Sequence, residues 1–350
     1  MLDWLVIGAD AKPAGRGVRG MALVWFLRTY FGRQAVQYLE PGQWHSDRPS
    51  AETIFLGLPT TLTPEEIEGL RESSGCRRVV AFNYFDEHEL AWSEDQAAAF
   101  RKAGEVYLKP WKEPVWATLP EYAELKMGTL PIRRYGRFTW ARRIDRWKGW
   151  FTKRPEPKYD VAFLGRPNHT RYLIDGEITS IDQRVEWMLD LKRNAPELKV
   201  WGGLVEVNEK QRQSLTERHG NIDDLLYQGN KVNFAKYWQN IRRSRVLLAP
   251  GGNVPWTYRH YECLYAGAAV ATLDFREREM LVPMPTHNMT HVPDGESCLP
   301  AVREALEMYQ TRPRLGAENI EFLETYLKDA AYSQSRAALI VRFQEQLGIR

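Results

Sequence analysis

The sequence predicts an α/β protein built from two Rossmann-like domains. Along most of the chain, short apolar runs typical of buried parallel strands alternate with amphipathic helical stretches. The length of 350 residues suits two domains. The apolar fraction of 43% is ordinary for a globular protein and is sufficient for two cores.

The first domain is expected to alternate strands and helices, with a glycine-rich loop after its first strand. The expected strands are 4–7, 35–39, 53–58, 78–83 and 106–109, and the expected helices are 21–31, 64–73 and 94–103. The loop contains Gly-x-Gly-x-x-Gly over residues 15–20, with Glu40 following the second strand. A dinucleotide fingerprint has its glycines on the strand-to-helix turn itself, whereas these begin eight residues after the strand. Dinucleotide binding is therefore the weaker alternative.

Polar residues follow two of these strands at their carboxyl ends, the edge where open α/β sheets place their ligands. Asp10 comes just after the first strand, and Asp86, Glu87 and His88 come after the fourth. Each is a candidate for the base that removes a proton from an acceptor hydroxyl. The alternative for each is an ordinary solvated or helix-capping residue.

A basic and aromatic segment follows the first domain. Four prolines interrupt residues 110–131, which indicates a crossover between domains and an insertion. Ten of residues 133–158 are Lys or Arg and two are acidic, although the whole chain has a formal net charge of only +3. The basicity of the protein is therefore local.

Within that segment the bulky apolar residues recur at helical spacing. Trp140, Ile144, Trp147 and Phe151 would share one helix face, with basic residues on the other faces. Three interpretations stay open for this helix. It packs its tryptophans on the core, lies on an anionic membrane surface, or binds nucleic acid or another polyanion.

The second domain is expected to contain a compact strand–loop–helix–strand unit. Apolar run 246–249 ends in a loop with Gly251 and Gly252, a helix capped by Thr257 follows, and 269–273 forms the next strand. The loop and the helix start together form an anion site, because free backbone N–H groups and the positive end of the helix dipole meet there.

Arg259 and Glu262 lie three residues apart, on one face of that helix and close to its start. An arginine suits a phosphate, and a glutamate suits a pair of sugar hydroxyls. The alternative is a simple ion pair on a solvated helix face.

These residues resemble a known family signature. Pro250-Gly251-Gly252, then Tyr258-Arg259-His260-Tyr261-Glu262, then Ala266-Gly267-Ala268-Ala269-Val270 is similar to the donor-site signature of GT-B glycosyltransferases. It is closest to the exostosin-like and bacterial spore-coat-type branch of glycosyltransferase family 1. The resemblance implies two Rossmann-like domains facing across a cleft, with a nucleotide-sugar donor in the C-terminal domain. It also implies that Glu262 contacts the ribose and Arg259 lies near the diphosphate.

The resemblance suggests further donor-binding residues. Retaining GT-B enzymes often place an arginine on the donor phosphates where this chain has Gly165-Arg166, and Lys231 is an additional candidate cation. Gly251 and Gly252 would let the backbone approach the phosphates closely. Pro255 stands where many retaining enzymes carry a second acidic residue, seven positions before Glu262, so the stereochemical outcome stays open.

No metal ion or other cofactor is expected. The chain has no Asp-x-Asp, the usual metal signature of the other large transferase fold. His287 and His291 have a spacing that suits zinc only on a helix, and nearby prolines disfavour a helix. Three scattered cysteines argue against disulfides and fit a reducing compartment. Without a signal peptide or a long apolar run, we expect a cytoplasmic protein that is soluble or attached to a membrane surface.

The sequence thus predicts a metal-independent glycosyltransferase that moves a sugar from a nucleotide sugar to a hydroxyl of a glycan or a lipid-linked acceptor. Two alternatives stay open: an enzyme that glycosylates modified DNA bases and holds DNA through 133–158, and a non-catalytic nucleotide- or sugar-binding module. The expected parts are an acceptor domain, the basic-aromatic segment, a donor domain and a C-terminal helix, over 1–110, 111–158, 159–330 and 331–350.

Overall fold

The chain forms two compact units in a computed structural model. The structure describes residues 2–10, 20–84, 88–122, 124–131, 137–150, 154–174, 177–229, 232–252, 257–282, 284–327 and 334–349. Unit 1 comprises Met1–Arg134, Glu277–Met284 and Thr325–Arg350, and unit 2 comprises Tyr135–Arg276 and Pro285–Glu324.

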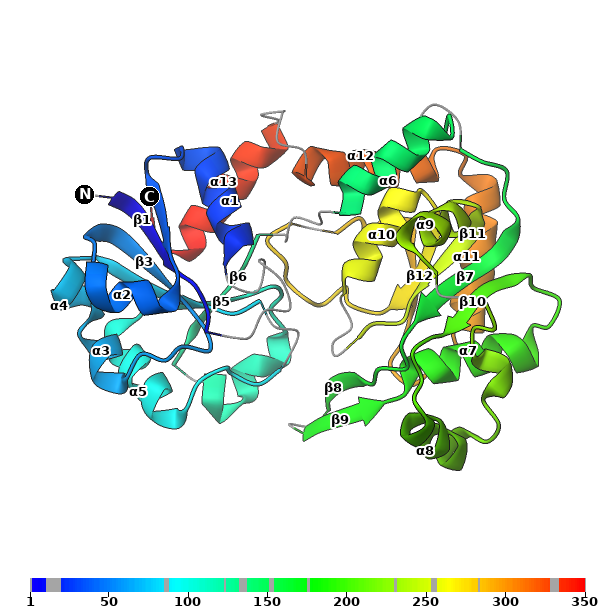
Figure 1. The fold of residues 1–350 in the computed structure, drawn as a ribbon, viewed down its shortest axis with the longest axis horizontal. Coiled ribbons are helices and arrows are strands. Elements are labelled where there is room, and N and C mark those ends of the chain that lie inside the picture. The colour runs from blue at the N-terminus through cyan, green and yellow to red at the C-terminus, as the bar shows by residue number, and fades with distance from the viewer. Residues whose placement is uncertain are drawn as a thin grey trace. The chain divides into compact units, whose positions relative to one another are not determined.

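Unit 1 contains a six-stranded parallel sheet with the order β2-β1-β3-β4-β5-β6 (Figure 1). The strands are β1 (Leu2–Ile7), β2 (Val36–Leu39), β3 (Ala51–Gly57), β4 (Arg78–Phe82), β5 (Val106–Lys109) and β6 (Lys126–Thr129). Leu5 of β1 lies opposite Gln37 of β2 on one side and Ile54 of β3 on the other. The strand order therefore reverses between β1 and β3.

Helices cover both faces of this sheet, which explains why its strands are almost continuously apolar. In Figure 1, α1 and α13 lie on one face and α3 and α5 on the other. Leu5 and Ile7 belong to the core on the α3 and α5 side, while Trp4 contacts Phe31 of α1 and Phe55 of β3. The helices are α1 (Met21–Phe31), α2 (Pro41–Asp47), α3 (Pro64–Glu68), α4 (Leu70–Ser74), α5 (Glu94–Ala103) and α13 (Gln334–Gln346), with short 3₁₀ turns η1 (Pro114–Thr118) and η2 (Pro120–Tyr122).

Two later segments complete unit 1. On α13, the Phe343 ring lies 5.0 Å from that of Phe26, and the Gln346 side-chain amide donates to the carbonyl of Thr129 at 2.7 Å. In the segment 277–284, Glu279 exchanges two backbone hydrogen bonds with Lys112, at 2.8 and 2.9 Å. The C-terminal helix and this short segment are therefore integral to the first unit.

Unit 2 repeats the same strand order in a five-stranded parallel sheet, β10-β7-β11-β12-β13. The reversal lies here between β7 and β11, where Val161 pairs with Val246. The strands are β7 (Tyr159–Gly165), β10 (Val200–Leu204), β11 (Ser244–Ala249), β12 (Ala269–Leu273) and β13 (Met289–Val292). A separate antiparallel pair is formed by β8 (Thr170–Ile174) and β9 (Glu177–Ile181).

The helices of unit 2 also divide between the two sheet faces. Residues of α7, α8 and α11 form one core with alternate residues of the strands, and α9 and α10 pack on β11 from the other side. Helix α6 packs against α9. The helices are α6 (Arg137–Trp147), α7 (Gln183–Asn194), α8 (Glu209–His219), α9 (Phe234–Arg242), α10 (Tyr258–Ala266), α11 (Leu299–Thr311) and α12 (Leu315–Leu327), with 3₁₀ turns η3 (Asp223–Leu225) and η4 (Thr286–Asn288).

The prediction of two Rossmann-like domains is confirmed, and several details differ from it. Strand β6 extends the first sheet into the expected crossover, although its sequence Lys-Met-Gly-Thr gives little strand signal. Strand β13 was expected to be irregular, because prolines surround its four residues. The limits of the units also differ from the expected domain limits, since α6 belongs to unit 2 and α13 to unit 1. No helix in the described ranges is long and apolar enough to cross a membrane.

Candidate functional site

The carboxyl ends of β7 and β11 form the point of strand-order reversal in unit 2. Ligands of open parallel sheets bind at such a point, because the connections leave the sheet in opposite directions and open a crevice. Gly165 ends β7, and Gly251 follows β11 with a φ of 74° that an L side chain rarely adopts. Helix α10 begins just beyond, where the Thr257 hydroxyl accepts from the backbone N–H of Arg259 at 3.3 Å.

Arg259 reaches from the first turn of α10 to the end of β7. Its Nη2 donates to the carbonyl of Leu164 at 2.6 Å, and its guanidinium lies 4.8 Å from the centre of the Phe163 ring. A Cβ atom at Gly165 would lie 3.0 Å from that Nη2, so glycine leaves the space that the arginine needs. The side chain is therefore fixed at the reversal point.

Glu262 lies behind Arg259 and is connected to it through Tyr237. The Tyr237 hydroxyl donates to Glu262 Oε2 at 2.6 Å and accepts from Arg259 Nη1 at 3.4 Å. Burial, with the carboxylate of Glu262 beside it, raises the pKa of Tyr237 well above its ordinary value, so the phenol stays a neutral donor. Glu262 is 8% exposed, which is inconsistent with a simple ion pair on a solvated helix face.

A second arginine at this point, Arg184, is buried, and no motif in the sequence marks it as a site residue. From the first turn of α7, its Nε and Nη2 donate to the carbonyl of Gly251 at 2.9 and 2.5 Å, and its Nη1 donates to the carbonyl of Arg166 at 2.9 Å. Burial, and then the charge of Arg259, lower the pKa of Arg184 to about 9, so it stays protonated at neutral pH. In the described part of the chain it makes no ion pair with a carboxylate.

His260 fixes the start of α10 without being charged. Its Nδ1 accepts from the backbone N–H of Thr257 at 3.1 Å, and its Nε2 lies 2.6 Å from the hydroxyl of Thr272 on β12. That hydroxyl donates in turn to the carbonyl of Ala249 at the end of β11. Complete burial is the main reason why the pKa of His260 falls to about 3, so the neutral ring connects α10 to two strands.

The other predicted donor-site residues have different environments. Gly252 is buried, and a Cβ atom there would lie 3.2 Å from Arg184 Nη2. The guanidinium of Arg166 is exposed and pairs with Glu206, so only its carbonyl takes part in the arrangement around Arg184. Tyr258 is the first residue of α10. Lys231 lies outside the described residues.

A pocket of about 510 Å³ adjoins this point. Leu164, whose carbonyl holds Arg259, forms part of its wall. The rest of the wall comes from the end of β10 and from the chain that leads to α9: Leu204, Val205, Glu206, Val207, Leu226, Tyr227, Gly229 and Val232. Its volume and its apolar lining are typical of small-molecule sites.

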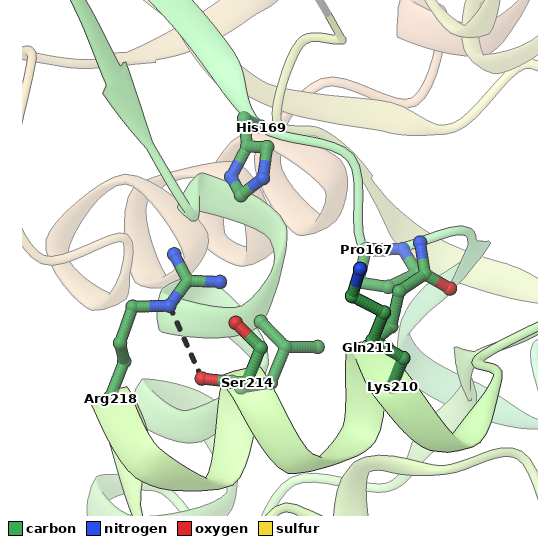
Figure 2. A pocket seen from close by; sticks show the side chains of 7 residues that line it. Pro167, His169, Lys210, Gln211, Ser214 and Arg218 are labelled. Atoms are coloured by element: carbon green, nitrogen blue, oxygen red, sulfur yellow. Dashed lines mark hydrogen bonds between the residues drawn. The ribbon is translucent and has the colours of Figure 1, made fainter.

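A smaller pocket of about 190 Å³ lies between the chain after β7 and helix α8 (Figure 2). His169 faces Ser214 and Arg218 of α8 across it. The lining residues are Pro167, His169, Lys210, Gln211, Ser214, Leu215 and Arg218. Both His169 and Arg218 contact the carboxylate of the buried Asp182, so their polar groups already have a partner within the fold. The volume is below that of typical ligand pockets.

In unit 1, Asp10 occupies the equivalent point of strand-order reversal. It follows β1, its backbone N–H donates to the carbonyl of Pro59 at 2.9 Å, and its Oδ2 accepts from the backbone N–H of Thr61. The loop after β3 therefore fixes this carboxylate. Its side chain is partly exposed, and it can reach a ligand.

His88 has a different environment. It is 2% exposed, and its ring makes edge contacts with Trp111 and Trp116 at centroid distances of 6.4 and 6.3 Å. A carboxylate beside the ring, that of Glu113, pairs with Arg278 at 3.0 Å. An imidazole within this cluster cannot reach an acceptor hydroxyl unless the cluster opens. Asp86 lies outside the described residues.

Comparison with known proteins shows a likeness in fold and none in sequence. No family model matches the chain, and no curated protein matches it. The structure of Anabaena HepE (Alr3699), solved with UDP-glucose, is similar with a TM-score of 0.53 at 10% identity, over 99% of this chain and 100% of that one. The UDP-GlcNAc 2-epimerase of Neisseria meningitidis, bound to UDP-GlcNAc, gives 0.40 at 9% identity over 99% of each chain.

A third structure, the pneumococcal O-GlcNAc transferase GtfA in complex with UDP and GlcNAc, gives a TM-score of 0.43 at 11% identity, over 84% of this chain and 56% of that one. The likeness to HepE includes both units and therefore supports the predicted GT-B type of fold. It does not single out the exostosin-like and spore-coat-type branch.

Proposed function

We propose that this protein is a glycosyltransferase that binds a nucleotide-sugar donor at the β7–β11 reversal point of unit 2 and transfers the sugar to a hydroxyl. The observation that carries the proposal is the pairing of Arg184 and Arg259 around the Gly251 loop and the start of α10. Anabaena HepE, which has a similar fold, was solved with UDP-glucose.

The two arginines suit a diphosphate. The positive charge of Arg259 contributes by repulsion to the lowered pKa of Arg184, and among the described residues Arg184 is held by backbone carbonyl oxygens and not by a carboxylate. A bound dianion would compensate this repulsion, and the N-terminus of α10 adds backbone N–H groups and the positive end of its dipole. As the sugar leaves, negative charge grows on the diphosphate, and the same groups stabilise it without a metal ion.

The 510 Å³ pocket suits the nucleoside. Leu164 belongs both to the pocket wall and to the arginine site, so a base in the pocket would direct its phosphates towards Arg259. The buried carboxylate of Glu262 lies on the same face of α10 as Arg259 and is held by the Tyr237 hydroxyl of α9. There it can accept hydrogen bonds from the two ribose hydroxyls.

We assign Asp10 as the base that takes the proton of the acceptor hydroxyl. It is partly exposed, it lies at the ligand edge of the unit 1 sheet, and the Thr61 N–H fixes its orientation. The acceptor is a glycan or a lipid-linked sugar in this proposal, and the configuration of the product is left to experiment.

The test is a binding and turnover screen with UDP, GDP, ADP, CMP and dTDP and their sugars, with and without EDTA. We expect one nucleotide to raise the melting temperature, and slow hydrolysis of its sugar to continue in EDTA. Arg259→Ala and Glu262→Gln should strongly reduce the shift. Arg193→Ala, which changes an exposed arginine at the end of α7, should keep it.

Each failure has a separate meaning. If no nucleotide binds, the donor site is wrong. If a nucleotide sugar binds but neither hydrolysis nor transfer follows, the protein is a binding module. If activity disappears in EDTA and returns with a divalent cation, the metal-independent mechanism is wrong.

A further inference from the structure

Two large tryptophan side chains stand exposed on helix α6. Trp140 is 60% and Trp147 is 77% exposed. They are seven residues apart, so they lie on one side of the helix about 10 Å apart along its axis. Exposed indoles of this size are uncommon on a soluble surface and indicate an interaction site.

The contacts of α6 show that these side chains do not belong to the core. Ala141 is buried, and Asp145 Oδ1 accepts from Trp238 Nε1 of α9 at 2.8 Å. Arg142 Nε donates to the hydroxyl of Tyr265 on α10 at 2.6 Å. This inner face fixes the rotation of the helix. The interpretation that Trp140 and Trp147 pack on the core is therefore wrong, because a different face of α6 does so.

The outer face of α6 is also cationic. Arg143, Arg146 and Lys148 are exposed, and the acidic residue of the helix, Asp145, is buried and lies 3.5 Å from Arg242. The guanidinium of Arg143 lies 5.3 Å from the centre of the Trp140 ring, and Lys148 Nζ lies 4.3 Å from that of Trp147. Each indole thus has a cation next to it.

We propose that the outer face of α6 docks on an anionic lipid bilayer, with both indoles at the boundary between headgroups and acyl chains. Tryptophan prefers this depth, because its ring is apolar and its N–H needs a polar partner. Arg143, Arg146 and Lys148 would contact lipid phosphates. This inference stands on α6 alone and does not depend on the proposed sugar transfer.

The geometry favours a membrane over a nucleic acid. Trp140 and Trp147 lie along one side of the convex surface of α6, so both rings can enter a flat bilayer surface to the same depth. Single-stranded nucleic acid needs a groove that follows its backbone beside the stacking rings. The two pockets of unit 2 described above lie elsewhere, after β7 and β10 and beside α8.

The test is co-sedimentation of the full chain with vesicles of phosphatidylcholine alone or with 30% phosphatidylglycerol. We expect partition onto the anionic vesicles only, and less of it in high salt. Each cation at an anionic surface contributes about fivefold, so R143Q/R146Q/K148Q should lower the partition coefficient about 100-fold. The matched control K192Q/R193Q/K210Q, which changes exposed cations of α7 and α8, should lower it far less.

A second measurement reports on the indoles themselves. Lipids with brominated acyl chains quench a tryptophan that reaches them, and the chain contains 13 tryptophans. W140F/W147F should remove most of the quenching while a ring still fills each position and the helix stays folded. Val341→Ala, at an exposed apolar residue of α13, should leave quenching and partition unchanged.

The proposal is overturned if anionic vesicles do not retain the protein, or if the control triple variant loses binding as strongly as the α6 triple variant. It is also overturned if quenching persists in W140F/W147F. Salt-sensitive binding to DNA or RNA without binding to vesicles would assign α6 to a nucleic acid instead.

Discussion

Both sheets reverse their strand order at the same place: β1 lies between β2 and β3, and β7 lies between β10 and β11. The side chains at the two reversal points differ. In unit 2, Arg184, Arg259 and a glycine loop lie there. In unit 1 the carboxylate of Asp10 lies there and accepts a hydrogen bond from the backbone N–H of Thr61.

This difference shows how much of a site comes from topology and how much from side chains. The strand order determines which edge of each sheet receives a ligand. The charge at that edge then determines which ligand suits it. Two guanidinium groups and a helix N-terminus suit a diphosphate, whereas a carboxylate of fixed orientation suits a general base that accepts a proton.

The largest effect should come from unit 1. Asp10→Asn keeps an oxygen that can accept from Thr61 but removes the base, so the transfer rate should fall about 10²- to 10⁴-fold with donor affinity unchanged. Steady-state kinetics and donor titration separate the two quantities. Asp3→Asn, an exposed change in β1, the strand that precedes Asp10, is the control. A loss of donor affinity in Asp10→Asn would remove the distinction between the two reversal points.

The next effect concerns the arginines of unit 2. Arg259→Ala removes a charged donor to the diphosphate, which contributes about 1.5–3 kcal/mol, so the dissociation constant of the donor should rise about 10- to 100-fold. Calorimetric titration measures this change. Asp10→Asn is the control, because it should leave the dissociation constant of the donor unchanged. If Arg259→Ala binds the donor as tightly as Asp10→Asn and the wild type do, the diphosphate binds elsewhere.

A pH effect should distinguish the helix start of unit 2. His260 has a pKa of about 3 in the folded chain and an ordinary value of 6.5, so the unfolded chain binds the proton between these values. Its contribution to stability is complete above pH 6.5 and decreases as the pH falls towards 3, by at most about 1.4 kcal/mol per pH unit.

The variant His260→Gln tests this, because glutamine retains a capping acceptor for the Thr257 N–H but does not titrate. Urea unfolding between pH 7.5 and 4.5 should show a shallower loss of stability in the variant than in the wild type. Parallel curves would mean that the imidazole is not buried as a neutral group.

The smallest effect should come from the glycine loop. In Gly252→Ala the new methyl group would lie 2.9 Å from Thr257 Cγ2 and 3.2 Å from Arg184 Nη2, so both must shift. A displacement at the low end of overpacking costs about 1 kcal/mol, which would weaken donor binding about fivefold. Gly42→Ala, where nothing lies within 4 Å of the new atom, should leave affinity unchanged.

The sequence was most informative where local chemistry determines structure. Helices 21–31 and 94–103 were predicted with the bounds that they have, because their apolar periodicity is clear and, in the second, Ser93 caps the first turn. The strand and helix on either side of the Gly251 loop followed from the same local signals.

Features that depend on tertiary contacts could not be predicted. Nothing in the sequence around Arg184 indicates that it is buried, because charged residues are common in the first turn of a helix. Its burial depends on the carbonyl of Gly251, a distant residue that accepts its hydrogen bond. His88 was selected for its place after β4, although Trp111 and Trp116 from a later segment enclose it. On α6 the sequence predicted the apolar spacing but left open which face packs on the core, and the Asp145–Trp238 hydrogen bond shows that it is not the tryptophan face.

The return of α13 to unit 1 has a consequence for biosynthesis. Phe343 contacts Phe26 and Gln346 bonds to Thr129, so the first sheet lacks part of its cover while the ribosome is still making unit 2. Domains usually fold in the order in which they emerge. Here unit 2 can finish before unit 1, because the face of the first sheet that α1 covers in part is completed only when α13, which follows unit 2 along the chain, has been made.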